Sequence, residues 1–184
     1  MRLLALAALP ALVSSAHALT LDVQGGFGKA GHFDNDGTYA ASLGGPINDE
    51  YSLGVTYLYS NLDTTGDAVF GTVNSNFHTV TADLTYDLSR GGLGAFIGIG
   101  AGQARIENTN GDIFNPVAPA TPQNITEFCA AVYVGTRMEI SQNLDFTLTV
   151  RYTRIFGVEE NAGGVASTQD IDHWAGLAGL RFKF

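Results

Sequence analysis

Residues 79–88, TVTADLTYDL, decide the fold class, because apolar and polar side chains alternate through the whole stretch. One face carries Val80, Ala82, Leu84, Tyr86 and Leu88, and the other carries Thr79, Thr81, Asp83, Thr85 and Asp87. Successive side chains of a β-strand point to opposite faces. A period of two therefore predicts a strand with one apolar and one polar face.

The same alternation recurs along the chain. Residues 144–152 repeat it strictly, and residues 173–184 repeat it less strictly. Softer versions of the pattern cover residues 19–27, 38–47, 51–60, 93–107 and 126–140. Together these segments predict eight strands and an all-β fold.

The connections between these strands alternate between short and long. Short polar turns are predicted at 48–50, 89–92 and 141–143, and long polar loops at 30–37, 61–77, 108–125 and 157–172. This alternation is typical of an eight-stranded antiparallel up-and-down transmembrane β-barrel with short periplasmic turns and long extracellular loops. Both chain ends are then expected on the short-turn side.

The polar faces distinguish a membrane barrel from the alternative, a soluble β-sandwich or lipocalin-like barrel. Charges of both signs lie on the faces expected to point inward: Asp22, Asp83, Asp87, Arg137, Glu139, Asp145, Arg151, Arg181 and Lys183. A soluble barrel of this size would fill its interior with apolar side chains. Aromatic residues near both ends of the apolar faces predict two interfacial girdles around a lipid-facing band.

The first 18 residues match a secretory signal peptide. Arg2 precedes an apolar run at 3–13, and an Ala-x-Ala sequence ends at Ala18. A membrane-spanning helix needs roughly 20 apolar residues, so this shorter run predicts a cleaved leader and not an anchor. We expect residues 19–184 to form one barrel domain.

The net charge and the cysteine count argue against a nucleic-acid partner and against an intramolecular disulfide. The formal net charge is −9, which argues against a nucleic-acid partner. Cys129 is the single cysteine of the chain, so no intramolecular disulfide can form, and we expect an ordinary buried thiol. No motif for a cofactor or a metal stands out. Residues Asp34 to Gly37 are similar to the start of a calcium-binding loop, but the twelfth position, where such a loop has Glu, is Gly45, so we interpret the segment as a turn.

The chain ends Gly179-Leu180-Arg181-Phe182-Lys183-Phe184. This segment resembles the C-terminal targeting strand of outer-membrane proteins, and the whole mature chain resembles the small barrels grouped around the opacity proteins and the transmembrane domain of outer membrane protein A, in the porin superfamily. The resemblance implies a Gram-negative outer membrane location and recognition of Gly179, Phe182 and Phe184 by the barrel-assembly machinery. Because the chain stops at Phe184, a peptidoglycan-binding domain is not expected.

Two groups of charged residues are candidate sites. An eight-stranded barrel is just wide enough for side chains, so the inward charges should pair and plug the interior. A short-turn-side ion network is predicted for Asp22, Asp87, Arg137, Glu139, Asp145, Arg181 and Lys183. Lys29, Arg105 and Arg154 project outward near the long loops, where we expect contacts with the phosphates of lipopolysaccharide.

The leading functional hypothesis is a non-enzymatic structural or surface-interaction barrel that displays acidic loops to an unknown ligand. A narrow porin-like channel for ions or small solutes is the first alternative. An outer-leaflet lipid-modifying enzyme is the second, although a deacylase-like site would call for a His-x-Ser pair on one strand. None of the four histidines fits that pattern. His17 lies in the predicted signal peptide, and the residues two positions after His32, His78 and His173 are Asp34, Val80 and Ala175.

Overall fold

The computed structural model describes residues 19–30, 36–64, 73–88, 93–108, 123–162 and 165–184. The predicted signal peptide lies outside the described residues, as do Asp34 in the predicted turn and most of the predicted loop at 108–125. No helix among the described residues has the length and apolar character needed to cross a membrane.

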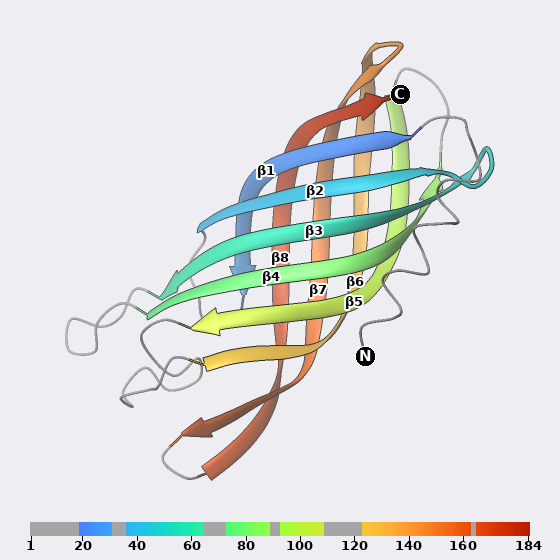
Figure 1. Ribbon diagram of the computed structural model, residues 1–184. Helices are drawn as coiled ribbons and strands as arrows, with labels where there is room; N and C mark the ends of the chain where they lie inside the picture. Colours follow the sequence, from blue (N-terminus) through green and yellow to red (C-terminus); the bar gives the residue numbers. More distant parts are fainter. Residues whose placement is uncertain (1–18, 31–35, 65–72, 89–92, 109–122, 163–164) are drawn as a thin grey trace.

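Eight antiparallel strands form a closed barrel in chain order (Figure 1). They are β1 (Thr20–Ala30), β2 (Asp36–Pro46), β3 (Tyr51–Thr64), β4 (Val73–Asp87), β5 (Leu93–Asn108), β6 (Gln123–Ser141), β7 (Leu144–Ala162) and β8 (Val165–Lys183). The predicted fold class is confirmed. Closure leaves no sheet edge exposed along the paired parts of the barrel, which a lipid environment requires of a strand protein.

The first and last strands close the barrel through a continuous ladder. Asp22 of β1 lies opposite Ser42 of β2 on one side and opposite Arg181 of β8 on the other. At the end of the chain, the Phe184 N–H donates to the Leu19 carbonyl oxygen at 2.9 Å. The two ends of the described chain therefore meet at the short-turn end, as predicted.

One short turn shows why these connections are tight. The Asn48 side-chain oxygen accepts hydrogen bonds from the N–H groups of Glu50 and Tyr51, both at 2.8 Å. Asparagine often closes turns by bonding its own neighbouring backbone in this way. The predicted turn at 48–50 is confirmed, and it fixes the register between β2 and β3.

Strands reach further into the long-loop side than the alternation predicted. The predicted loop at 157–172 is mostly strand, because β7 continues to Ala162 and β8 starts at Val165. Figure 1 shows this hairpin projecting at the end opposite the C-terminus. A register shift between Ile155 and Val158, with Gly157 at φ 67°, breaks the alternation there. The alternation of apolar and polar residues ends at this bulge, whereas the pairing of β7 with β8 continues beyond it.

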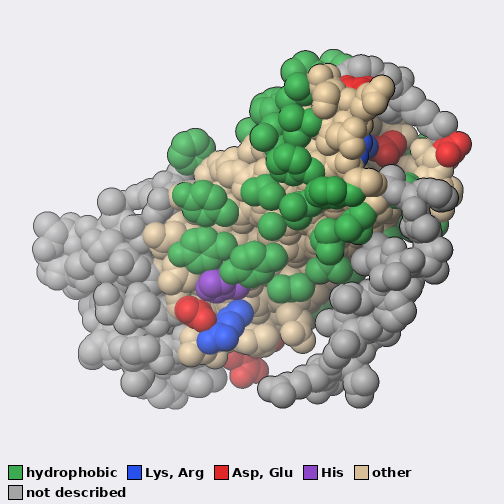
Figure 2. Space-filling view, turned by 45° about the horizontal axis from the view of Figure 1, so that its top comes forward, with side chains coloured by type: hydrophobic (Ala, Val, Ile, Leu, Met, Phe, Trp, Pro, Cys, Tyr) green, Lys and Arg blue, Asp and Glu red, His purple; other side chains and the backbone are tan. Residues whose placement is uncertain are grey.

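The two faces of the barrel wall differ as predicted. Outward positions carry exposed apolar side chains over most of the surface, including Val23, Tyr57, Ile97, Val134 and Val150. Figure 2 shows these apolar side chains as a broad patch over the strands. Buried polar side chains lie on the opposite face, inside the barrel. A water-soluble protein would have the reverse arrangement, so the wall matches a lipid environment.

Candidate functional site

A buried ion pair lies at the centre of the barrel. Arg151 of β7 and Asp83 of β4 face each other across the interior, with Nη1 2.9 Å from Oδ2 and each residue 4% exposed. Arg151 also donates to the Thr81 hydroxyl at 2.6 Å, and the Thr56 hydroxyl donates to Asp83 at 2.7 Å. Buried charges are tolerated when they are paired and hydrogen-bonded, and this pair meets both conditions.

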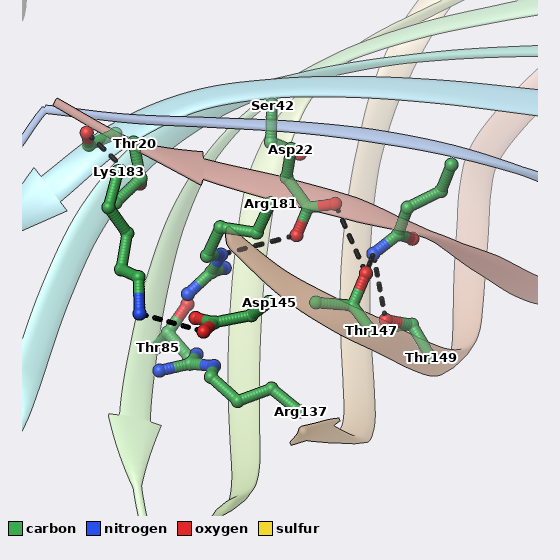
Figure 3. A network of polar contacts seen from close by, with 12 residues as sticks. Thr20, Asp22, Ser42, Thr85, Arg137, Asp145, Thr147, Thr149, Arg181 and Lys183 are labelled. Atoms are coloured by element: carbon green, nitrogen blue, oxygen red, sulfur yellow. Dashed lines mark hydrogen bonds and ion pairs between the residues drawn. The ribbon is translucent and has the colours of Figure 1, made fainter. Parts of the chain in front are cut away.

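Three more ion pairs lie between this centre and the short-turn end. The paired atoms are Arg181 Nε and Asp22 Oδ2 at 3.3 Å, Lys183 Nζ and Asp145 Oδ1 at 2.7 Å, and Arg137 Nη1 and Asp87 Oδ1 at 2.9 Å. Figure 3 shows the first two pairs as dashed lines, with Arg137 nearby. Neutral side chains extend the network, because Gln24 donates to both Thr147 and Thr149.

The structure brings together all but one of the residues predicted for the ion network. Glu139 is exposed, and no ion pair joins it to the other described residues. It lies opposite another carboxylate, Asp145, in the last pair before the register between β6 and β7 shifts. The ion network of the described residues therefore leaves out Glu139, because Arg137, Arg181 and Lys183 are already paired with other carboxylates.

Two aromatic side chains inside the barrel were missed by the sequence reasoning. Phe96 and Tyr133 pack over the bare backbone of Gly135 and Gly98, where a Cβ would collide with the rings. Arg137 lies over the Phe96 ring at 4.9 Å, and the Arg151 guanidinium lies over the Tyr133 ring at 5.1 Å. The glycines of β5 and β6 were the available signal, since an inward glycine makes room for a large neighbour.

A cavity of about 70 Å³ lies within this polar half of the barrel. Asp22, Asp83, Arg151 and Arg181 line it, together with the Tyr133 ring. The space suits ordered water, since the lining offers several donors and acceptors. Ala40 and Leu177 also line this cavity and belong to a small buried apolar cluster with Leu58 and Ala175.

The long-loop half of the interior contains a large apolar cluster, which the sequence did not predict. A buried cluster, here called the apolar plug, contains Ala30, Phe77, Ala104, Ile106, Cys129, Ile155, Val158 and Ile171. Each of these residues is at most 5% exposed. The signal was present in the inward positions of the strands, where charges give way to isoleucine and phenylalanine towards the long loops. The buried thiol predicted for Cys129 is confirmed.

Hydroxyl groups and one histidine lie beside the apolar plug, with His173 opposite Ala30 and Ser60 opposite Phe77 in the register. His173 is 2% exposed and stacks on Phe77 of the apolar plug, with ring centroids 6.3 Å apart. Its Nε2 lies 3.3 Å from the Ser60 hydroxyl, which lies 2.6 Å from the Thr38 hydroxyl. The fold thus creates a Ser–His contact between two strands, which a His-x-Ser pattern within one strand does not describe.

The three cations predicted to point outward do so. Lys29, Arg105 and Arg154 are all exposed on the outer wall. Arg105 Nη2 lies 2.9 Å from Glu107 Oε1, whereas Lys29 forms no ion pair with the other described residues. Arg105 and Arg154 are therefore both paired with carboxylates of the chain itself.

Arg154 belongs to a cluster at the base of the β7–β8 hairpin. Its Nη2 lies 2.8 Å from Asp170 Oδ2, and Asp170 also accepts a hydrogen bond from the Gly157 N–H at 3.0 Å. Asp170 lies beyond the ring of outward cations, outside the lipid band, where the Gly157 N–H and then Arg154 hold its pKa below the usual range. These contacts tie the bulged backbone of β7 to β8 and fix the direction of the hairpin.

The residues of the predicted assembly signal lie together at the short-turn end of β8. Phe182 and Phe184 are 38% and 72% exposed on the outer wall. Gly179 points inward, where a Cβ would collide with the backbone of Val23 and Gln24 on β1. The glycine permits close packing of β1 on β8, so part of this signal serves barrel closure.

Known proteins share this architecture. The family described as outer membrane protein beta-barrel domain matches residues 2–182. Neisserial surface protein A shares 16% identity at a TM-score of 0.68, covering 91% of this chain and 99% of its own. The N-terminal barrel of Pseudomonas aeruginosa OprF shares 16% identity at a TM-score of 0.56, covering 90% of this chain and 97% of its own.

A third structure with the same fold is Ail, the attachment invasion locus protein of Yersinia pestis. It shares 12% identity at a TM-score of 0.50, covering 89% of this chain and 99% of its own. No curated protein sequence matches the chain. At these identities the solved structures support the fold alone, whereas the family match covers nearly the whole sequence. The chain belongs to the outer membrane protein beta-barrel domain family and is an outer-membrane protein.

Proposed function

We propose that this protein is a closed, non-conducting and non-enzymatic barrel that presents interaction surfaces at the cell exterior. The observation that carries the proposal is the filling of the interior. Ion pairs bridge the short-turn half, and the apolar plug fills the long-loop half with residues at most 5% exposed.

The apolar plug argues against a narrow porin-like channel. An ion that crosses the plug would lose its hydration shell and meet few polar groups and no opposite charge, and burial of an unpaired charge is strongly unfavourable. Hydrophobic constrictions close membrane channels for the same reason. The charges in the other half are paired with one another, so they offer no continuous row of free sites for an ion.

The position of His173 argues against catalysis. Its contact with Ser60 lies inside the barrel wall, and both residues are at most 2% exposed. A lipid or peptide substrate would have to displace Phe77, which stacks on the histidine ring. The hydroxyl of Ser60 is also shared with Thr38, which supports a structural tie between β2, β3 and β8.

The exterior surfaces suit two kinds of partner. Exposed acidic side chains on the β7–β8 hairpin include Glu159, Asp170 and Asp172, and the whole chain has a net charge of −9. Such a surface favours cationic partners or divalent cations shared with the outer leaflet. Ail, another barrel of this fold, was crystallised in complex with the heparin analogue sucrose octasulfate.

Contacts with membrane components complete the proposal. Lys29 is the outward cation best placed to meet a lipopolysaccharide phosphate, because carboxylates already engage Arg105 and Arg154. Phe182 and Phe184 lie exposed on the last strand, where the barrel-assembly machinery could recognise them during insertion.

Conductance of the purified barrel in planar bilayers tests this function. The wild-type protein should leave the membrane electrically silent at neutral pH. A variant with Phe77→Gly and Ile155→Gly removes bulk from the apolar plug and provides the matched control for an opened interior. Large, stable single-channel steps from the wild-type barrel would contradict the proposal and favour the porin-like alternative.

A further inference from the structure

The outer wall of β3, β4 and β5 carries a polar and aromatic surface at its long-loop end, here called the girdle patch. It consists of Tyr57, Tyr59, His78, Arg105 and Glu107. Tyr59 lies opposite His78 in the register, and His78 lies opposite Arg105. Figure 2 shows a histidine with a basic and an acidic side chain at the edge of the apolar surface.

Contacts within the girdle patch hold its side chains in place. The Tyr57 hydroxyl lies 2.8 Å from His78 Nδ1, and His78 Nε2 lies 3.9 Å from Glu107 Oε2. Glu107 is also paired with Arg105 at 2.9 Å. The Tyr59 and His78 rings lie 5.1 Å apart at the centroids. The patch is therefore ordered before a ligand arrives, which lowers the entropic cost of binding.

The chemistry of the patch fits a sugar better than a phosphate. The positive charge of Arg105 is balanced by Glu107, so the pair exerts little net attraction on an anion. The same groups supply hydrogen-bond donors and acceptors for hydroxyls. Tyr57 is 43% exposed, and the neighbouring Tyr39, whose ring stacks on Tyr59 at 6.5 Å, is 61% exposed. Such rings offer apolar surface with a polar edge, which matches the C–H face of a sugar ring.

The position of the patch identifies the kind of molecule that carries the sugar. Val80 follows His78 on the same face of β4, towards the middle of the membrane, and Phe128 lies on the same wall of β6. Both side chains are about half exposed and belong to the lipid-facing band. A ligand with its sugar on the girdle patch would thus have its acyl chains on Val80 and Phe128.

We propose that the girdle patch binds the sugar headgroup of an outer-leaflet glycolipid, of the lipopolysaccharide type. The inference rests on the outer-membrane location and is independent of whether the interior conducts ions. It differs from a phosphate contact at Lys29, which lies on β1, because the girdle patch recognises sugar hydroxyls and ring faces.

The opposite wall offers a matched control surface. Tyr152 and Trp174 also lie at the long-loop end, with ring centroids 4.7 Å apart. The Tyr152 hydroxyl donates to Asp172 at 2.6 Å, and Arg154 is held by Asp170. If interfacial aromatic residues only anchor the barrel in any lipid, substitutions on the two walls should have equal effects.

The test measures binding of purified lipopolysaccharide, and separately of phosphatidylethanolamine, to the detergent-solubilised full-length barrel. The girdle variant Tyr59→Leu with His78→Leu should bind lipopolysaccharide about tenfold more weakly, the loss expected when aromatic packing and hydrogen bonds disappear together. The control variant Tyr152→Leu with Trp174→Leu should stay close to the wild type. Phosphatidylethanolamine binding should not change in either variant.

Equal weakening in both variants, or no weakening in the girdle variant, would overturn the proposal. An equal loss of phosphatidylethanolamine binding would also overturn it, because that result indicates general lipid anchoring. Heat-dependent mobility on gels checks that each variant is folded. If the girdle variant does not fold, Tyr57→Phe replaces it, since this change removes the hydroxyl near His78 and keeps the ring; unchanged lipopolysaccharide binding would then contradict the proposal.

Discussion

The two halves of the barrel interior are occupied by different kinds of side chain, charged in one half and mainly apolar in the other. From the centre to the short-turn end, four ion pairs cross the interior and leave a cavity of about 70 Å³. In the long-loop half, the apolar plug fills it without charges. The same strands build both halves, so the difference comes mainly from which residues occupy the inward positions.

This difference has energetic consequences. Buried ion pairs contribute little net stability, but removal of one partner leaves an uncompensated charge. The apolar plug resembles the core of a soluble protein, where each removed methyl group leaves a cavity. Substitutions in the two halves should therefore destabilise the barrel by separate mechanisms, and paired substitutions can tell them apart.

The largest expected effect is at the centre of the polar half. Asp83→Ala leaves Arg151 buried without its carboxylate, so we expect a loss of about 3–5 kcal/mol in the free energy of unfolding. Urea unfolding of the detergent-folded barrel measures it. The double variant Asp83→Leu with Arg151→Met removes both charges and should recover most of the loss; a double variant as unstable as Asp83→Ala would refute this account of the pair.

A comparable effect is expected in the apolar plug, for a different reason. Ile155→Ala should lower the unfolding free energy by about 2–5 kcal/mol, because Ile155 is fully buried and the gap cannot be filled by water. Ile155→Val is the matched control, with an expected loss of about 1 kcal/mol. If both variants unfold at the wild-type urea concentration, the long-loop half is not packed as described.

A smaller effect is expected at the short-turn end. Arg137→Ala removes the contacts with Asp87 and with the Phe96 ring. Both charged side chains are partly exposed, so solvent screens the pair and the loss should be about 1 kcal/mol. It would appear as a lower temperature for the heat-induced mobility shift on gels. An unchanged temperature would show that this ion pair does not contribute to stability.

The smallest effect is expected at Glu139. Because this residue is exposed and forms no ion pair with the other described residues, Glu139→Gln should change the unfolding free energy by less than about 0.5 kcal/mol. The same urea titration measures it. A loss as large as that of Arg137→Ala would restore Glu139 to the ion network predicted from the sequence.

The strands within the lipid band and the direction in which their faces point were predictable from the sequence. The alternation at 79–88 and 144–152 indicates strands with lipid on one face. The pairing of Asp22 with Arg181 follows because the last strand of a closed barrel lies beside the first. Beyond the lipid band both faces meet water or protein, so alternation loses its contrast, and the strands of the β7–β8 hairpin were interpreted as a loop.

Contacts that depend on three-dimensional neighbours were not predictable. Ser60 and His173 are far apart in sequence, and their contact depends on how β3 and β8 face each other across the interior. The carboxylates that engage Arg105 and Arg154 come from register and local backbone geometry. The apolar plug was overlooked because its members are spread over six strands, one or two residues at a time.

Thiol labelling of the folded barrel tests the two-part interior most directly. Cys129 is the single cysteine of the chain and lies fully buried in the apolar plug, whereas Thr85 lines the cavity of the polar half. A small water-soluble thiol reagent should leave Cys129 unmodified until the barrel is unfolded, and it should label the variant Thr85→Cys with Cys129→Ala in the folded state. Labelling of Cys129 in the folded barrel as fast as the cysteine introduced at position 85 would contradict the account, because it would show that water fills the interior from end to end.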